Sequence, residues 1–347
     1  MNDFDINKLV RKNVALMQPY SSARDEYKNY DHQMVFLDAN ENSFAGSVGR
    51  YPDPQQTILK AELAKLKNIC MDTILLGNGS DEVIDLIFRA FCEPGKDNVI
   101  TLPPTYGMYG VLASLNDIEN REVLLTDDFQ PNVTAIFEKA DANTKIIFLC
   151  SPNNPTGNAF SDESIRELVE NFNGLIVLDE AYIDFSGSKS WLDEIVDYPN
   201  LLIIQTLSKA RGMAGLRVGM LLAQPAVIAL LNKIKPPYNV NILSQQQGFA
   251  GLQKTRQFDT HLDLIKESRR KLIEELPQIK FIQKVYPSDA NFILIKVDHA
   301  GLRYRQLLQL GIVVRDRSSQ PLCENCLRIT IGTPQENQTL MNALKTL

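Results

Sequence analysis

The sequence predicts an α/β fold in which a mostly parallel sheet flanked by helices precedes a smaller α+β domain. Short apolar runs alternate with helical patterns up to about residue 235, as they do where crossover helices join parallel strands. Pro236-Pro237 ends this alternation, and the 347 residues suffice for two domains. We therefore expect a large domain over residues 46–238 and a small domain over 239–347. Residues 1–45 are expected to form an N-terminal arm that packs with the small domain.

Seven segments of the expected large domain are short and rich in Ile, Val or Leu, as buried parallel strands are. They are residues 73–76, 99–102, 123–125, 145–150, 175–179, 201–206 and 217–222. In the small domain, long helical stretches through 242–275 precede four more strand candidates. These are residues 281–285, 291–297, 312–315 and 327–331.

Helices are expected between the strands of the large domain. One follows the cap candidate Ser80, because apolar residues recur there at helical spacing. They are Val83, Ile84, Ile87, Phe88 and Phe91. Pro131 suits the first turn of a second helix, and Ser161 begins a third.

Composition and charge exclude several classes of protein. With 36 Lys+Arg against 42 Asp+Glu and no basic block, nucleic acid is not an expected partner. No apolar run approaches the roughly 18 residues that span a bilayer. The start MNDFDINKLV is too acidic and polar for a signal peptide. We therefore expect a cytoplasmic protein.

The cysteines and histidines predict no metal site and no histidine catalyst. Five cysteines suit a reducing compartment better than a disulfide framework. Cys323 and Cys326 form a lone CxxC, and no second pair or nearby histidine completes a zinc site, so both are interpreted as structural. His32, His261 and His299 occur in no recognisable catalytic motif.

Polar segments follow several of the expected strands at their carboxyl ends, where open parallel sheets bind ligands. They are residues 77–82, 103–107, 151–157, 179–182 and 206–209. The glycines of 77–82 would let backbone N–H groups approach an anion at a helix N-terminus. Taken alone, the same segment favours a tight turn with a Ser or Asp cap, and it has neither a Walker loop nor a dinucleotide motif.

Lys209 and Asp179 are the two candidates for catalytic chemistry. Lys209 follows an apolar strand and precedes a run of small residues, so its amine is expected to face a crowded cleft, where a lowered pKa would make it a nucleophile. Asp179 ends the apolar run 175–178, where a free carboxylate is costly unless a cation or hydrogen bonds compensate it. The alternatives are a surface lysine and a helix cap.

Together these residues supply what pyridoxal phosphate requires: a lysine for its aldehyde, a carboxylate for its ring nitrogen, and an anion site with Arg217 for its phosphate. Residues 151–157 (SPNNPTG), 179–182 (DEAY), 208–209 (SK) and Arg217 occur in this order. The set resembles the motifs of fold-type I aminotransferases of the aspartate aminotransferase class. The resemblance implies a PLP-dependent transferase of fold type I, with a mostly parallel seven-stranded sheet.

The resemblance also implies roles for individual residues. Lys209 would join the cofactor's aldehyde and carry the proton between the substrate Cα and the cofactor, while Asp179 would keep the ring nitrogen protonated. Asn154 and Tyr182 would hydrogen-bond the phenolic oxygen. The remaining cofactor contacts would come from Tyr106 on the ring face, from Ser80, Asp81, Ser208 and Arg217 around the phosphate, and from Tyr51 and Glu82.

Further segments, at residues 18–24, 37–42, 50–53, 104–109, 314–316 and 326–330, are similar to the histidinol-phosphate aminotransferase family. That resemblance implies amine exchange between L-histidinol phosphate and 2-oxoglutarate in histidine biosynthesis, giving imidazole acetol phosphate and L-glutamate. It implies that Arg315 and Arg328 bind the acidic group, that Tyr20 closes over the substrate phosphate, and that Tyr51 enters from the other subunit of a homodimer. Asn40 and Glu41 are further substrate-binding candidates.

Two alternative functions are enzymatic and use the same scaffold, and a third is not enzymatic. An aromatic amino acid aminotransferase or a threonine-phosphate decarboxylase would use the same Lys209 and Asp179. A PLP-binding regulatory module without turnover is opposed by the presence of Lys209, Asp179, Tyr182 and Asn154 and by the lack of a DNA-binding extension.

Overall fold

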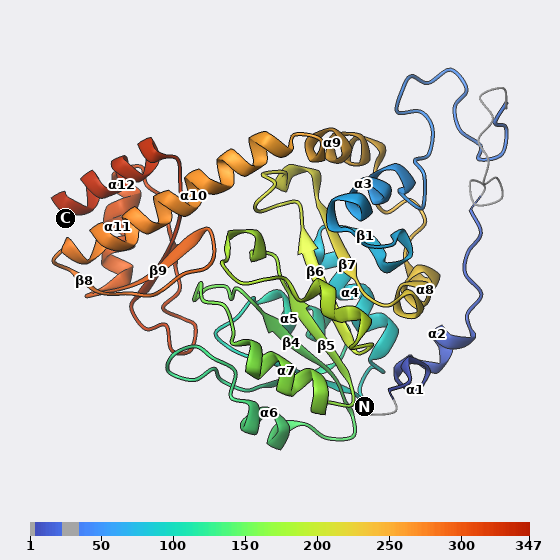
Figure 1. The fold of residues 1–347 in the computed structure, drawn as a ribbon, viewed down its shortest axis with the longest axis horizontal. Helices are drawn as coiled ribbons and strands as arrows, with labels where there is room; N and C mark the ends of the chain where they lie inside the picture. The colour runs from blue at the N-terminus through green and yellow to red at the C-terminus, as the bar shows by residue number, and fades with distance from the viewer. Residues whose placement is uncertain (1–3, 23–34) are drawn as a thin grey trace.

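The computed structural model describes residues 4–22 and 35–347, which form two sheets surrounded by helices (Figure 1). In the described chain the larger sheet has the strand order β1-β7-β6-β5-β4-β2-β3. Its strands are β1 (Ile74–Asn78), β2 (Asn98–Thr101), β3 (Glu119–Glu122), β4 (Thr144–Cys150), β5 (Leu175–Asp179), β6 (Leu201–Thr206) and β7 (Val218–Leu222). Pairing is parallel from β3 through β6, and β7 runs antiparallel to both of its neighbours. The predicted mostly parallel, seven-stranded sheet is confirmed.

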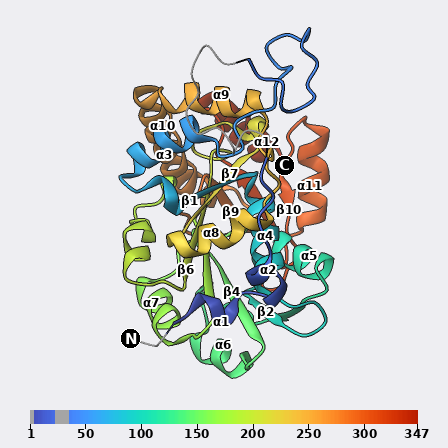
Figure 2. The same cartoon turned by 90° about the vertical axis from the view of Figure 1, so that its right-hand side faces the viewer.

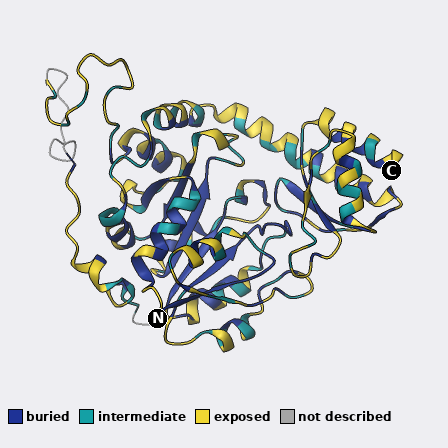
Figure 3. Cartoon of the chain, turned by 180° about the vertical axis from the view of Figure 1, so that it is seen from behind, coloured by how far each residue is buried: buried dark blue, intermediate teal, exposed yellow. Residues whose placement is uncertain are grey.

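Helices cover both faces of this sheet because successive strand residues point to opposite sides. Ile147 and Leu149 belong to the apolar core beneath α3 (Thr57–Lys67), α6 (Val133–Lys139) and α7 (Asp162–Asn171). Ile146 and Phe148 belong to the core on the other face, with α4 (Ser80–Phe91), α5 (Met108–Leu115) and α8 (Pro225–Ile234). The central strands are therefore buried on both sides (Figure 3).

The expected strand at 123–125 lies in the wrong place. The structure puts β3 at Glu119–Glu122, directly before the expected segment. β3 is polar because it forms an edge of the sheet and is only partly covered. Val123 and Leu125 still donate backbone hydrogen bonds to the carbonyls of Thr101 and Pro103. Their apolar side chains pack into the core beyond the end of the strand, which explains the misleading pattern.

Two of the expected helix starts also need correction. The N-cap of α4 is Gly79, so Ser80 is the first helical residue and no side chain caps this end. The cap of α6 is Asn132, whose side chain accepts from the Ala135 N–H, and Pro131 lies before it. Ser161 does cap α7, by accepting a hydrogen bond from the Ser164 N–H.

The smaller sheet is antiparallel, with the order β10-β11-β9-β8 among the described residues. Its strands are β8 (Ile282–Val285), β9 (Phe292–Val297), β10 (Arg315–Asp316) and β11 (Cys326–Thr330). Its helices are α11 (Ala300–Gln309) and α12 (Pro334–Thr346), and α9 (Ile242–Leu252) and α10 (Thr255–Glu275) connect it to the larger sheet (Figure 1). Short 3-10 turns complete the described fold: η2 (Met71–Thr73), η3 (Ile183–Phe185), η4 (Trp191–Val196), η5 (Ala214–Leu216) and η6 (Leu276–Gln278).

The two short helices of the N-terminal arm pack on the helices of the larger sheet, not on the small domain as the sequence led us to expect, whereas residues 35–45 are exposed or half-buried. Its helices α1 (Ile6–Leu9) and α2 (Lys12–Leu16) lie near α4 and α8 (Figure 2). The Arg11 N–H donates to the Ala90 carbonyl at 2.9 Å, and Lys233 Nζ donates to the Ala15 carbonyl at 2.9 Å. The physical reason is that Ile6, Val10 and Val14, spaced by four, enter the core of α4 and α8. None of the described helices combines the length and apolar character needed to cross a membrane.

Candidate active site

A cavity of about 270 Å³ lies at the carboxyl ends of β4, β5 and β6, where Cys150, Asp179 and Thr206 line it. The antiparallel strands β10 and β11 contribute Arg315 and Arg328 from the other side. Most of the sequence-predicted residues meet here: Ser80, Asp81, Tyr106, Asn154, Asp179, Tyr182, Ser208, Lys209, Arg217, Arg315 and Arg328. The two catalytic candidates, Lys209 and Asp179, therefore share one cavity.

Asp179 is a buried carboxylate with two hydrogen bonds. It is the last residue of β5 and 3% exposed. Tyr109 Oη donates to its Oδ2 at 2.7 Å, and the Ala181 N–H donates to its Oδ1 at 3.0 Å. Burial raises the pKa of Asp179, and these hydrogen bonds together with the charge of Lys209 oppose that rise. No Lys or Arg of the described residues lies within 4.0 Å of its oxygens, so a cationic group in the cavity would stabilise its charged form.

Lys209 lies in the loop after β6, and it lines the cavity. Its Nζ lies 5.4 Å from the centre of the Tyr182 ring. Desolvation lowers the pKa of this amine, and the positive charge of Arg328 lowers it further, while Asp179 acts in the opposite direction. A lowered pKa increases the neutral fraction of the amine, which is the form that attacks carbonyl carbon and accepts protons.

The N-terminus of α4 and Arg217 form a site suited to an anion. Gly79 caps the helix with φ +83° and offers no side chain, so the first N–H groups of α4 have no side-chain cap. A Cβ on Gly79 would come within 2.5 Å of Arg217 Nη2, so only glycine lets this guanidinium lie against the helix end. A Cβ on Gly219 of β7 would lie 2.2 Å from the Ser80 nitrogen, and glycine therefore also permits the close approach of strand to helix. Arg217 Nη2 is 3.6 Å from Asp81 Oδ2.

Tyr106 is fixed by the same helix end. Its hydroxyl donates to Asp81 Oδ1 at 2.9 Å, and its ring packs edge-on against Tyr109, with the centroids 5.5 Å apart. Burial and the neighbouring Asp81 charge raise the pKa of this phenol, so Tyr106 stays neutral. A neutral aromatic ring held by its hydroxyl is suited to cover the face of a planar ligand.

The guanidinium of Arg328 reaches across from the small sheet. Its Nη1 donates to Asn154 Oδ1 in the loop after β4, and its Cζ lies 5.1 Å from the centre of the Phe292 ring. Arg328 is the register partner of Arg315, so both side chains project from one face of the β10–β11 pair. Burial lowers the pKa of Arg328. Burial raises the pKa of the neighbouring Tyr182.

Five predicted residues do not line this cavity in the single chain. Glu82 Oε2 accepts hydrogen bonds from the Asn78 N–H and from Asn239 Nδ2, so it fixes the strand-to-helix turn. The other four are Tyr20, Asn40, Glu41 and Tyr51. Tyr20 is 74% exposed on the arm, and the remaining three line a separate cavity of about 550 Å³. Their assignments to the substrate site stay predictions.

Four residues at the site were not among the predicted site residues: Cys150, Thr206 and Arg317 line the cavity, and Tyr109 contacts Asp179. Tyr109 lies beneath Asp179 and comes from α5, about seventy positions earlier; no local motif links the two. Cys150 and Thr206 are the last residues of predicted strands, and their places at strand ends could have indicated them. Arg317 could be predicted only if the pairing of β10 with β11 were known. Arg211, two residues after Lys209, does not line the cavity; its Cζ lies 3.6 Å from the centre of the Phe258 ring.

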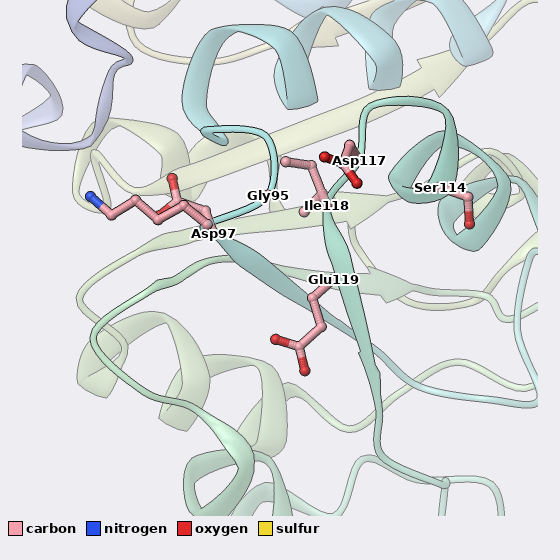
Figure 4. Close-up of a pocket in the computed structure, with 7 residues that line it drawn as sticks. Gly95, Asp97, Ser114, Asp117, Ile118 and Glu119 are labelled. Carbon is pink, nitrogen blue, oxygen red and sulfur yellow. The ribbon is translucent and has the colours of Figure 1, made fainter.

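A third cavity, of about 310 Å³, lies at the opposite end of the strands, at the amino ends of β2 and β3 (Figure 4). Asp97, Asp117 and Glu119 line it, and the Gly95 N–H donates to the Asp117 carbonyl at 2.7 Å. Its carboxylates stand at strand starts, whereas the ligand sites of parallel sheets lie at strand ends. The geometry therefore assigns the chemistry to the cavity of Lys209 and Asp179.

A lysine and a buried carboxylate at the strand ends of such a sheet are the arrangement of a fold-type I transferase. The chain belongs to the family described as aminotransferase class I and II, which it matches over residues 25–344. The predicted family and fold class are confirmed.

Curated relatives match the chain from end to end. The histidinol-phosphate aminotransferase of Flavobacterium psychrophilum is 62% identical over 347 residues, covering 100% of both chains. The protein of the same name from Bacteroides fragilis is 51% identical over 340 residues, 98% of each chain.

Solved structures share the fold. The histidinol-phosphate aminotransferase from Clostridium acetobutylicum has a TM-score of 0.79 at 26% identity, covering 86% of this chain and 90% of that one. The enzyme of that name from Sinorhizobium meliloti, in complex with pyridoxal-5'-phosphate, has a TM-score of 0.78 at 24% identity, covering 87% and 83%. The second likeness concerns the fold alone.

Proposed function

We propose that this chain is a pyridoxal-phosphate-dependent aminotransferase that exchanges the amine of L-histidinol phosphate with 2-oxoglutarate, giving imidazole acetol phosphate and L-glutamate. The observation that carries the proposal is the shared cavity of Lys209 and Asp179, which also contains several arginines. The full-length relatives at 62% and 51% identity bear the name of this activity.

The residues of the cavity fit the cofactor. Asp179 is a buried carboxylate with no Lys or Arg nitrogen within 4.0 Å among the described residues, and a protonated ring nitrogen would supply a close cation. The N-terminus of α4, together with Arg217 and Ser208, would hold the phosphate, because its backbone donors have no side-chain cap. Tyr106 would cover the ring, and Asn154 and Tyr182 would hydrogen-bond the phenolic oxygen.

When bound, the cofactor supplies an aldehyde that condenses with amines and a ring that accepts electrons from the substrate Cα. Asp179 holds a proton at the ring nitrogen, since its buried negative charge favours the protonated form of that nitrogen. Lys209 Nζ accepts a proton from the substrate Cα and returns one. Its lowered pKa suits this work, because it increases the neutral fraction of the amine, which is the form that accepts a proton.

The arginines would bind the acidic groups of both substrates. Histidinol phosphate presents a phosphate and 2-oxoglutarate two carboxylates, and guanidinium groups form paired hydrogen bonds with either. Arg328 and Arg315, partners on β11 and β10, are placed for this task. We retain Tyr20, Asn40 and Glu41 as substrate-binding residues in the proposal.

A homodimer with a shared active site is part of the proposal. Tyr51 is 51% exposed and stacks on Tyr238, with ring centroids 4.5 Å apart. Exposed apolar side chains surround this pair, among them Val48 and Leu243. Such a patch suits a subunit contact through which Tyr51 would reach the neighbouring cofactor. Sedimentation equilibrium of the purified protein would test the stoichiometry. The domain limits of 1–45, 46–238 and 239–347 and a cytoplasmic location also stay proposals.

The experiment that tests the function compares three amino donors. Purified protein loaded with pyridoxal phosphate is assayed with 2-oxoglutarate and L-histidinol phosphate, phenylalanine or threonine phosphate, while carbon dioxide release is followed with the third. We expect the highest kcat/KM with histidinol phosphate. Preference for phenylalanine would favour an aromatic aminotransferase, and carbon dioxide release would favour a decarboxylase. Lack of turnover with every donor would favour a regulatory module.

A further inference from the structure

Three arginine side chains share one face of the β10–β11 pair. Arg315 lies opposite Arg328 in the antiparallel register. Arg317 follows Arg315 by two positions, which in extended backbone returns a side chain to the same face. The Arg317 N–H donates to the Cys326 carbonyl at 2.9 Å, so the pairing of the two segments continues past Asp316. All three arginines line the cavity of Lys209.

These arginines have no carboxylate partner within 4.0 Å among residues 4–22 and 35–347. The Nε atoms of Arg317 and Arg328 are buried, and in that part of the chain neither has a hydrogen-bond acceptor. Burial lowers the pKa of Arg317, and the charge of Arg315 lowers it further; burial and then Arg317 do the same to Arg328. Three crowded cations, of which Arg317 and Arg328 are partly buried and Arg315 is exposed, favour a multiply charged anion.

The other end of the cavity has its own cation for the cofactor. Arg217 lies beside the N-terminus of α4 and 3.6 Å from Asp81, so the proposed cofactor phosphate would bind there. The three-arginine face is therefore available to the substrate. A carboxylate carries one charge on two oxygens, which two guanidiniums can satisfy. A phosphate monoester carries about 1.5 to 2 negative charges at neutral pH on three terminal oxygens, and a third guanidinium suits it better.

We propose that Arg317 is a specificity-determining residue that favours the phosphate-bearing amino donor over substrates carrying only carboxylates. This inference rests on the proposed function and deepens it. Arg315 and Arg328 serve both classes of substrate, whereas Arg317 contributes mainly when a phosphate is bound.

The test compares Arg317→Gln, Arg317→Lys and the unaltered enzyme loaded with cofactor. Initial rates are measured with L-histidinol phosphate, with L-histidinol, which lacks the phosphate, and with varied 2-oxoglutarate. We expect Arg317→Gln to lower kcat/KM for histidinol phosphate roughly 10- to 100-fold, as the loss of a charged hydrogen bond does, mainly through KM. The values for histidinol and 2-oxoglutarate should change little. Arg317→Lys should restore part of the loss, because lysine keeps the charge without the planar fork.

A matched control removes one positive charge from a helix beside the small sheet, away from the cavity. Arg305→Gln alters an exposed arginine of α11 and should leave every ratio of kcat/KM unchanged. Equal losses for all substrates in Arg317→Gln, or no loss, would overturn the proposed specificity role. A merely structural role would lower activity without changing the ratio between histidinol phosphate and histidinol.

Inhibition by inorganic phosphate gives an independent readout. We expect its inhibition constant to rise in Arg317→Gln and to stay constant in Arg305→Gln. If the unaltered protein does not use histidinol phosphate, the proposed function is wrong. Phosphate inhibition of whatever turnover it shows, or phosphate binding by calorimetry, would still decide whether Arg317 binds phosphate, and an unchanged constant would refute it.

Discussion

The hydrogen bond from Tyr109 to Asp179 makes the charge state of the buried carboxylate open to experiment. Tyr109 is fully buried in α5 and stacks on Phe148, with ring centroids 4.8 Å apart and planes inclined by 15°. Burial and the Asp179 charge raise the pKa of Tyr109 well above its usual range, so its hydroxyl remains a donor. Tyr109→Phe removes this one oxygen and keeps the stacked ring.

The magnitude follows from the kind of bond that is lost. At 2.7 Å, the O–H to carboxylate contact is a charged hydrogen bond, and such bonds contribute about 1.5–3 kcal/mol. The Ala181 N–H remains as the other donor to Asp179. Since the lost bond favoured the charged form, its removal raises the pKa of Asp179 beyond the rise that burial already causes.

The sign for stability follows from proton linkage. The folded-state pKa of Asp179 lies above its unfolded value, so the folded chain binds this proton more tightly than the unfolded chain does. The unfolding free energy therefore falls as pH rises from the unfolded pKa to the folded pKa. In Tyr109→Phe the unfolding free energy continues to fall up to the higher folded-state pKa of Asp179. Above that pKa, we expect the variant without cofactor to be about 1.5–3 kcal/mol less stable than the parent.

The assay is the pH profile of kcat/KM together with the dissociation constant of the cofactor. We expect the acidic limb of the profile to move to higher pH in Tyr109→Phe, with weaker cofactor binding. Tyr198→Phe is the matched control, because Tyr198 also donates to a carboxylate, Glu170 at 2.9 Å, but at the surface. An unchanged profile and unchanged cofactor affinity in Tyr109→Phe would refute the argument that this bond sets the Asp179 charge.

Three further predictions address other parts of the site. Lys209→Ala should abolish turnover and the yellow absorbance of the bound cofactor, both measured by spectrophotometry. If the variant kept both, another lysine would be the one that binds the cofactor. Gly79→Ala should weaken cofactor binding and lower the unfolding free energy by about 1–3 kcal/mol, because φ 83° with ψ 165° is strained for any residue but glycine and the new Cβ would displace the Arg217 guanidinium; Gly187→Ala, with open space around it, should do neither. Glu180→Ala should lower the melting temperature by breaking three buried hydrogen bonds of about 1–3 kcal/mol each, and an unchanged temperature would contradict this.

The sequence predicted that the two proposed catalytic residues, Asp179 and Lys209, lie in one cavity because a general rule of parallel sheets applied to them. Asp179 and Lys209 both follow apolar strands, and the carboxyl ends of neighbouring parallel strands meet at one edge. The strands 175–179 and 201–206 were predicted with their observed limits for the same reason, since they are buried on both faces. Tyr109 could not be predicted, because its contact with Asp179 depends on how α5 packs beneath β5.

Segment 188–193 has a structural role that only the fold reveals. Ser190 Oγ donates to Glu180 Oε2 at 2.5 Å, and the Trp191 N–H donates to Glu180 Oε1 at 2.8 Å. Gln205 Nε2 also donates to Glu180, at 2.8 Å, and Lys67 Nζ contacts Gln205. The segment thus satisfies a buried carboxylate next to Asp179 and holds the end of β5 in place.

Glu180 and Asp179 are neighbours on the same chain, yet the fold treats their charges differently. Burial raises the pKa of both, but Glu180 receives three protein donors, whereas Asp179 receives two and faces the cavity. The charge of Glu180 is therefore compensated by the protein itself. Asp179, like the three arginines across the cavity, depends on what binds for full compensation. The same uncompensated charges that reduce the stability of the chain alone would thus strengthen binding of a cationic ring and an anionic substrate.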